Sequence, residues 1–142
     1  MQDNSMMILK VLLWLICAAH ISLGVGLNVS NEFVRLVADI YGAQVEWTPQ
    51  FIYILKPLGA FMFVLGVLAA MAAGNRLGHR VIVNGFVLLF AIRACQRLVY
   101  QSEIHDTFAI AVGRNLVAMI FFFALGALLF VLYRYVEKSA VT

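Results

Sequence analysis

The sequence predicts an all-α integral membrane protein: one domain over residues 1–142, folded as a four-helix bundle with a short amphipathic interfacial helix in its first outer loop. Of its 142 residues, 64% are hydrophobic and 12% are charged, whereas soluble domains carry about 25% charged residues. Four apolar stretches each supply the about 20 residues that a helix needs to cross the hydrocarbon core. The basic residues lie at or near the ends of these stretches and not in one patch, so we interpret them as topology signals and expect no nucleic-acid site.

The predicted spans are the four longest apolar stretches. They lie at about residues 8–28, 51–73, 79–100 and 108–134. The first has no base before Lys10, and its apolar run is longer than the core of a signal peptide, so we take it as a span. Thr48 and Pro49 are typical of a helix start, because proline is favoured in the first turn. Gly74 and the residues to position 78 predict a short turn after the second span.

Residues 30–42, between the first two spans, predict a short amphipathic helix. Its apolar residues recur at i, i+3, i+4, i+7 and i+8, and they are Phe33, Leu36, Val37, Ile40 and Tyr41. Ser30 is a typical N-cap and Gly42 a typical C-cap. We expect this helix to lie on the outer membrane surface or over the mouth of the bundle.

The charges in the loops predict the orientation. One side of the membrane receives most of the basic residues near the span ends, namely Lys10, Arg76, Arg80, Arg134 and Lys138. The two opposite loops hold Arg35 among five acidic residues. By the positive-inside rule, both chain ends and the turn at 74–78 are expected on the cytoplasmic side.

Four cations lie within the spans, each toward the outer end. They are Lys56, Arg93, Arg97 and Arg114. A charge at the bilayer centre costs about 2.5–3.5 kcal/mol on insertion scales, so such residues need compensation. Either they reach the outer headgroups and pair with acids of the outer loops, or they converge on a pocket that holds a carboxylate, sulfur oxyanion, phosphate headgroup or quinone carbonyl. Arg93, Gln96, Arg97 and Tyr100 share one helix face. The pocket is favoured because three spans contribute cations at similar depth.

His20 lies deeper, near the middle of the first span. No second histidine is expected at matching depth, so a hydrogen bond to a neighbouring helix or to a ligand is favoured over haem ligation. Small residues at i+4 spacing, Ala18, Ser22 and Gly26, predict close helix packing nearby. The sequence has no nucleophile with an evident base, no paired intramembrane carboxylates and no zinc motif, so no catalytic or metal-binding residue is assigned.

Three short motifs resemble the DoxX-like group of small four-helix bacterial membrane proteins. They are Tyr41-Gly42, then Leu55-Lys56-Pro57-Leu58-Gly59-Ala60 in the second span, and Arg93-Ala94-Cys95-Gln96-Arg97 in the third. The resemblance covers roughly residues 8–100. It implies a four-helix bundle in the bacterial inner (cytoplasmic) membrane, and some members of the group are associated with quinone-linked sulfur oxidation or with membrane oxidoreductase complexes. A second cluster, Arg97-x3-Gln101-x-Glu103, is similar to the basic-amide-acid cluster of membrane glutathione-type transferases, with Gln in place of Asn and a different spacing.

The leading functional hypothesis is a non-enzymatic binding module or accessory subunit of a membrane (quinone-linked redox) complex. It would hold a lipid headgroup, quinone or small anion in a cationic pocket in the outer half of the bundle. The expected anchors are Lys56, Arg93, Arg97 and Arg114, and the expected hydrogen-bonding residues are Gln96, Tyr100 and His20.

Two alternatives remain open. One is an enzyme, either a DoxX-like oxidoreductase subunit or a glutathione-type transferase. The other is a small-solute carrier built from two hairpins, with Asn84 and His20 on a deeper path. The partners we expect are membrane lipid and either a larger membrane complex or further copies of the chain. No cofactor is indicated beyond a bound quinone or lipid.

Overall fold

The computed structural model describes residues 2–74 and 79–139, and this part of the chain is helical apart from short connections. Four helices are long and apolar enough to cross a membrane, which confirms the prediction of an all-helical chain with four such spans. They are α1 (Gln2–Val29), α3 (Pro49–Gly74), α4 (His79–Val99) and α6 (Val112–Ser139). The predicted turn beyond Gly74, including Arg76, lies outside the described residues.

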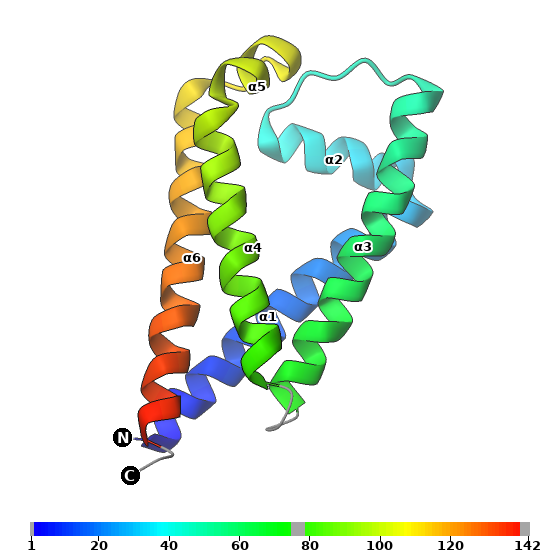
Figure 1. Cartoon of the computed structure of the whole chain (residues 1–142). Coiled ribbons are helices and arrows are strands. Elements are labelled where there is room, and N and C mark those ends of the chain that lie inside the picture. The colour runs from blue at the N-terminus through cyan, green and yellow to red at the C-terminus, as the bar shows by residue number, and fades with distance from the viewer. Residues whose placement is uncertain (1, 75–78, 140–142) are drawn as a thin grey trace.

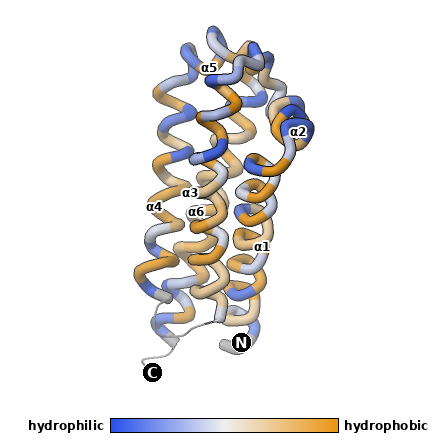
Figure 2. The backbone as a smooth tube through the Cα atoms, turned by 90° about the vertical axis from the view of Figure 1, so that its right-hand side faces the viewer, coloured by the Kyte–Doolittle hydropathy of each residue, from blue (hydrophilic) through white to orange (hydrophobic). Residues whose placement is uncertain are grey.

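Each pair of spans is joined by a short helix, α2 (Asn31–Tyr41) in the first hairpin and α5 (Gln101–Phe108) in the second. Helix α1 packs mainly along α3, and α4 packs mainly along α6. We call the end at which α1 begins and α6 ends the terminal end, and the end that carries α2 and α5 the loop end (Figure 1). The polar segments gather at these two ends, while apolar residues dominate the long helices between them (Figure 2).

The packed core lies in the half of the molecule nearer the terminal end. It combines the first half of α1, the last turns of α3, most of α4 and the second half of α6. Leu9, Leu13, Ala72, Val83 and Leu129 are fully buried there. Toward the loop end the two helix pairs splay apart and α2 runs between α3 and α4 (Figure 1). Side chains of α1, α2, α3 and α4 line a cavity there.

Glycines allow α1 and α3 to approach closely. A Cβ atom added to Gly24 would lie 2.6 Å from the backbone nitrogen of Phe63 and 2.8 Å from the carbonyl oxygen of Gly59. The predicted stripe does not make this contact, because Ala18 and Ser22 are exposed. The prediction of close packing holds at Gly26, where an added Cβ atom would meet the Phe33 ring of α2, and is wrong at Ala18 and Ser22. Small residues recur on several faces of α1, and the large core residues decide which face turns inward.

Helix α2 forms with both predicted caps. The Ser30 hydroxyl accepts a hydrogen bond from the Phe33 backbone nitrogen at 3.1 Å. Gly42 adopts a left-handed conformation with φ of 70°, which glycine reaches without strain. The inward face overlaps the predicted stripe in part: Val34 is buried and Val37 lines a cavity, whereas Leu36 and Ile40 are exposed. Because the apolar arc of α2 is broad, its periodicity alone does not determine which part of the arc faces the protein.

The second short helix, α5, was expected to be an outer loop followed by a span from residue 108. Instead, Ala109 ends α5 in a left-handed conformation with φ of 52°, and α6 begins at Val112. The backbone nitrogen of Gln44 donates to the carbonyl oxygen of Phe108 at 2.8 Å, which joins the two connecting segments at the loop end. The absence of glycine and proline from residues 101–108 was the signal for a helix.

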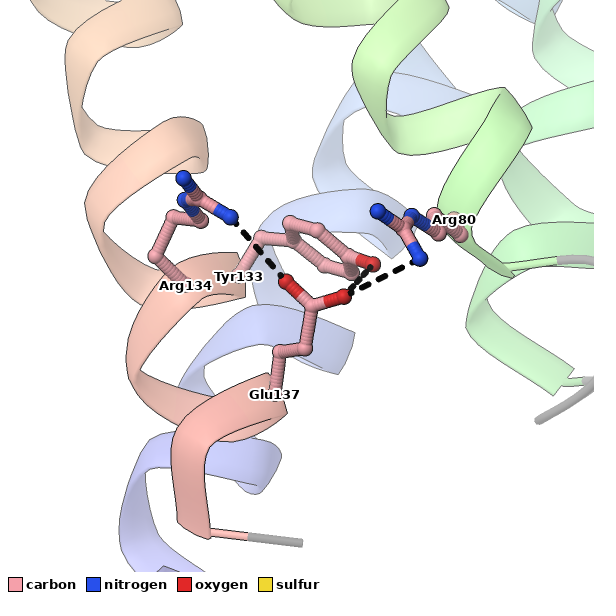
Figure 3. A network of polar contacts seen from close by, with 4 residues as sticks. All are labelled: Arg80, Tyr133, Arg134 and Glu137. Atoms are coloured by element: carbon pink, nitrogen blue, oxygen red, sulfur yellow. Dashed lines mark hydrogen bonds and ion pairs between the residues drawn. The ribbon is translucent and has the colours of Figure 1, made fainter. Parts of the chain in front are cut away.

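A polar network links α4 and α6 at the terminal end (Figure 3). Glu137 accepts from Arg80 and from Arg134, each at 3.5 Å, and from the Tyr133 hydroxyl at 3.3 Å. The Arg80 and Arg134 side chains are 71% and 57% exposed. The network thus lies at the surface, where solvent screens the charges.

Glu137→Gln is expected to lower the free energy of unfolding by less than about 1 kcal/mol, because exposed ion pairs contribute little. The measurement is a titration with sodium dodecyl sulfate in mixed micelles, followed by circular dichroism. A loss of several kcal/mol would show that the network is an essential link between α4 and α6.

Candidate functional site

Arg93 and Arg97 lie one turn apart on α4, and Asn115 of α6 holds the second of them. The Arg97 Nη1 atom donates to Asn115 Oδ1 at 2.9 Å, and Asn115 Nδ2 donates to the Arg97 carbonyl oxygen at 2.8 Å. Asn115 is 1% exposed. These two reciprocal bonds fix both the backbone and the guanidinium of Arg97 relative to α6.

Aromatic rings, and not carboxylates, surround the two guanidinium groups. The Arg93 Cζ atom lies 4.7 Å from the ring centroid of Phe122, and Arg97 Cζ lies 5.3 Å from that of Tyr41. Such contacts stabilise a cation through the ring quadrupole. Over residues 2–74 and 79–139, no ion pair joins either arginine to an acidic side chain. For these two residues, the structure does not show the expected pairing with acids of the outer loops.

A cavity of about 350 Å³ lies next to these arginines, between α1, α2, α3, α4 and the segment that follows α2. We call it the α2 cavity. Its walls are mostly apolar and include Leu27, Val37 and Leu58. Arg93 and Arg97 are the charged residues in its lining. The cavity therefore combines a cationic wall with apolar sides contributed by α1, α2, α3 and Phe108 of α5.

A second cavity, of about 450 Å³, lies between α1, α4 and α6, and we call it the His20 cavity. Arg93 and Tyr41 line both cavities, so they stand at the boundary between them. His20 is 6% exposed, and its Nδ1 atom donates to the Ile16 carbonyl oxygen at 2.9 Å. This bond lies within α1 and does not reach a neighbouring helix, contrary to what the sequence suggested.

The other two predicted cations lie outside both cavities. The Lys56 ammonium donates to the Asn28 carbonyl oxygen at 2.9 Å, near the C-terminal end of α1. A cation is favoured there because the last carbonyl groups of a helix carry partial negative charge. Arg114 is exposed, and its side chain lies against Gly42. Of the four predicted anchors, the structure brings together Arg93 and Arg97.

Gln96 and Tyr100 lie on the side of α4 that faces away from the bundle. Both are exposed, and with Arg93, Arg97 and Ile104 they line a shallow hollow. They are therefore neighbours of the arginines without entering the α2 cavity. Asn84, which the carrier hypothesis placed on a deeper path, is exposed and lines neither cavity.

Sequence reasoning did not assign Asn115 and Phe122 to the site. The signal for Asn115 was an amide inside an apolar span, which needs a hydrogen-bonding partner in a neighbouring helix. Phe122 is one of 11 phenylalanines in the chain, and nothing in the sequence distinguishes it.

Comparison of the chain with family models, with curated proteins and with solved structures returns no match. The DoxX-like resemblance thus stays a prediction from short motifs. Function has to be inferred from the site itself.

Proposed function

We propose that the protein is a membrane-embedded binding module for an anionic amphiphile. The head of this ligand, a carboxylate, sulfonate or phosphate, contacts Arg93 and Arg97, and its apolar tail occupies the α2 cavity. One observation carries the proposal: two neighbouring guanidinium groups line an apolar cavity, and no carboxylate pairs with them in the described part of the chain.

The charge of the ligand follows from the cost of the two cations. An intramembrane charge costs about 2.5–3.5 kcal/mol at the bilayer centre and less near the surface. Contacts with Phe122 and Tyr41 offset part of this cost. A neutral carbonyl, as in a quinone, would leave both positive charges uncompensated, whereas an anionic head neutralises one and accepts bidentate hydrogen bonds. The site therefore favours an anion over a quinone.

The tail of the ligand follows from the lining. The α2 cavity is bordered by leucine, valine and phenylalanine side chains of four helices, including Leu23, Leu55 and Phe108. A small inorganic anion would leave this apolar surface empty. A hydrocarbon chain fills it, and moving the chain there from lipid costs no desolvation because both surroundings are apolar.

The proposed setting is a bacterial inner membrane with both chain ends in the cytoplasm. Arg80 lies in the first turn of α4, Lys10 in the third turn of α1, and Arg134 and Lys138 in the last two turns of α6, which fits the positive-inside rule. Helices α2 and α5 would then lie at the outer surface, where the exposed Leu36 and Ile40 can contact lipid. An accessory role in a quinone-linked redox complex remains a prediction from the DoxX-like resemblance.

Fluorescence of Trp47, which lines the α2 cavity, gives the test. In a Trp14→Phe background Trp47 is the single tryptophan. We expect a bromine-tailed alkyl sulfonate, added to phosphatidylcholine vesicles with the protein, to quench Trp47 at lower concentration than the alcohol of equal chain length. Arg93→Gln should raise the sulfonate concentration needed about tenfold or more, since a charged hydrogen bond contributes about 1.5–3 kcal/mol.

Arg114→Gln is the matched control, because Arg114 is exposed and lies outside the cavity lining. Its quenching curve should match that of the parent protein. Equal quenching by sulfonate and alcohol, or an unchanged curve for Arg93→Gln, would refute the proposal. Arg93 is the better target than Arg97, because replacing Arg97 also breaks its bond to Asn115 Oδ1.

A further inference from the structure

His20 presents a buried hydrogen-bond acceptor that has no partner. Its Nδ1 atom contacts the Ile16 carbonyl oxygen, which can only accept, so Nδ1 carries the proton. In the neutral ring Nε2 then carries a lone pair. Nε2 is fully buried, and among the described residues no other buried side-chain nitrogen or oxygen atom lacks a partner. Buried polar atoms are normally satisfied, so this exception points to a missing partner.

His20 lines the His20 cavity, and a turn of its ring would bring Nε2, which has no accessible surface of its own, to a partner there. The cavity volume of about 450 Å³ falls in the range of small-molecule pockets, roughly 300–1,000 Å³. A single water occupies about 30 Å³, so water at Nε2 would leave most of the cavity empty. The mouth of the cavity includes Leu15 and Phe121, which are 63% and 59% exposed on the long helices. A ligand would therefore enter from the hydrocarbon region.

The chemistry of Nε2 restricts the ligand. A carboxylate or a carbonyl group offers no hydrogen to a lone pair, so the partner must carry an O–H or N–H group. The described residues contain no group of three or more His, Cys, Asp or Glu side chains that would complete a metal site around His20. A neutral hydroxyl group is the donor that enters an apolar cavity at the lowest desolvation cost.

The cavity walls favour an aromatic ring. Phe90 and Phe122 stack with their centroids 6.2 Å apart, and His20 lies 6.4 Å from Phe90. Phe121 continues this series at 5.5 Å from Phe122. Aromatic rings attract one another at centroid distances of 4.5–7 Å. Phe90 and Phe122 are buried against each other, whereas Phe121 is exposed, so a further ring can pack against Phe121 within the cavity.

We propose that the His20 cavity is a second binding site, for a membrane-soluble phenol whose hydroxyl group donates to His20 Nε2. The ring lies against Phe121. This inference does not depend on the proposed function, because the anionic head is assigned to Arg93 and Arg97 and the phenol to an acceptor on α1.

The test uses para-butylphenol and its methyl ether, para-butylanisole, which has the same ring and tail but no donor. The protein carries nitrogen-15 in its three histidines, and His20→Gln identifies the His20 signals. We expect the phenol to shift the His20 Nε2 signal and the methyl ether to leave it in place. In wild-type protein the phenol should also bind about tenfold more tightly than the ether, after correction for partition into the micelle.

Two variants separate the hydrogen bond from general packing. His20→Phe should abolish the preference for phenol over ether, and His20→Gln, which retains an acceptor, should keep part of it. If the Nε2 signal of the wild-type protein does not move in saturating phenol, the proposal is overturned. Equal binding of para-butylcyclohexanol and the phenol would overturn the aromatic assignment. Quenching of Trp47 by the alkyl sulfonate should be unchanged in His20→Phe, so failure at one site is distinguishable from failure at the other.

Discussion

Asn115→Leu is expected to lower the free energy of unfolding by about 1–3 kcal/mol, the cost of leaving buried polar groups without partners. Asn115 is buried and exchanges two hydrogen bonds with Arg97. Leucine fills similar space but accepts no hydrogen bond, so the Arg97 guanidinium loses its oxygen partner on α6. Individual hydrogen bonds between membrane helices average about 0.6 kcal/mol, and the charge on Arg97 places this case higher. Unfolding by sodium dodecyl sulfate in mixed micelles measures the difference.

Asn84→Leu is the matched control. It replaces an asparagine of α4 by leucine in the same way. Asn84, however, is exposed and has no hydrogen bond in the described part of the chain. Removing an amide from a lipid-facing position should leave stability unchanged or raise it. Equal losses for the two variants would mean that the bonds between Asn115 and Arg97 contribute nothing specific. If the loss is confined to Asn115, we also expect weaker quenching by the sulfonate, because Arg97 is no longer held at the cavity.

Hydropathy and charge predict the spans well because the hydrocarbon core imposes length and apolarity on every spanning helix. The caps of α2 were predictable for a similar reason: Ser30 and Gly42 act through local backbone geometry. The face that α1 turns toward α3 was not predictable. Lipid and protein interior are equally apolar, so hydropathy does not distinguish the face with Gly24 from the face with Ala18.

The candidate site, like the fold, was predictable only in part. The spacing of Arg93 and Arg97 places both on one face of a helix, and they do line one cavity. Lys56 and Arg114 occur at comparable depth in the sequence, yet Lys56 contacts the end of α1 and Arg114 lies outside the cavity lining. Depth follows from counting residues along a span, whereas convergence depends on how the helices rotate and cross. The sequence alone therefore could not show that only two of the four predicted cations line the cavity.

Gly24→Leu is expected to have the largest effect on the α1–α3 pair, with a loss of about 1–3 kcal/mol or more from overpacking. Even the first added carbon would lie 2.6 Å from the Phe63 backbone nitrogen, and backbone cannot move aside as a flexible side chain can. The two helices would have to separate. Separation would also strain the bond from Lys56 to the Asn28 carbonyl oxygen, which spans the same interface. The measurement is again unfolding by sodium dodecyl sulfate.

Gly85→Leu on α4 tests whether the loss comes from the helix contact or from the substitution itself. A Cβ atom at Gly85 would meet nothing within 4 Å, and leucine has a higher helix propensity than glycine, so this variant should be neutral or slightly stabilised. A Gly24→Leu protein as stable as Gly85→Leu would mean that α1 and α3 do not approach this closely. Because Leu23 and Leu27 of α1 line the α2 cavity, a wider separation of α1 from α3 should also reshape that cavity and weaken quenching of Trp47 by the sulfonate.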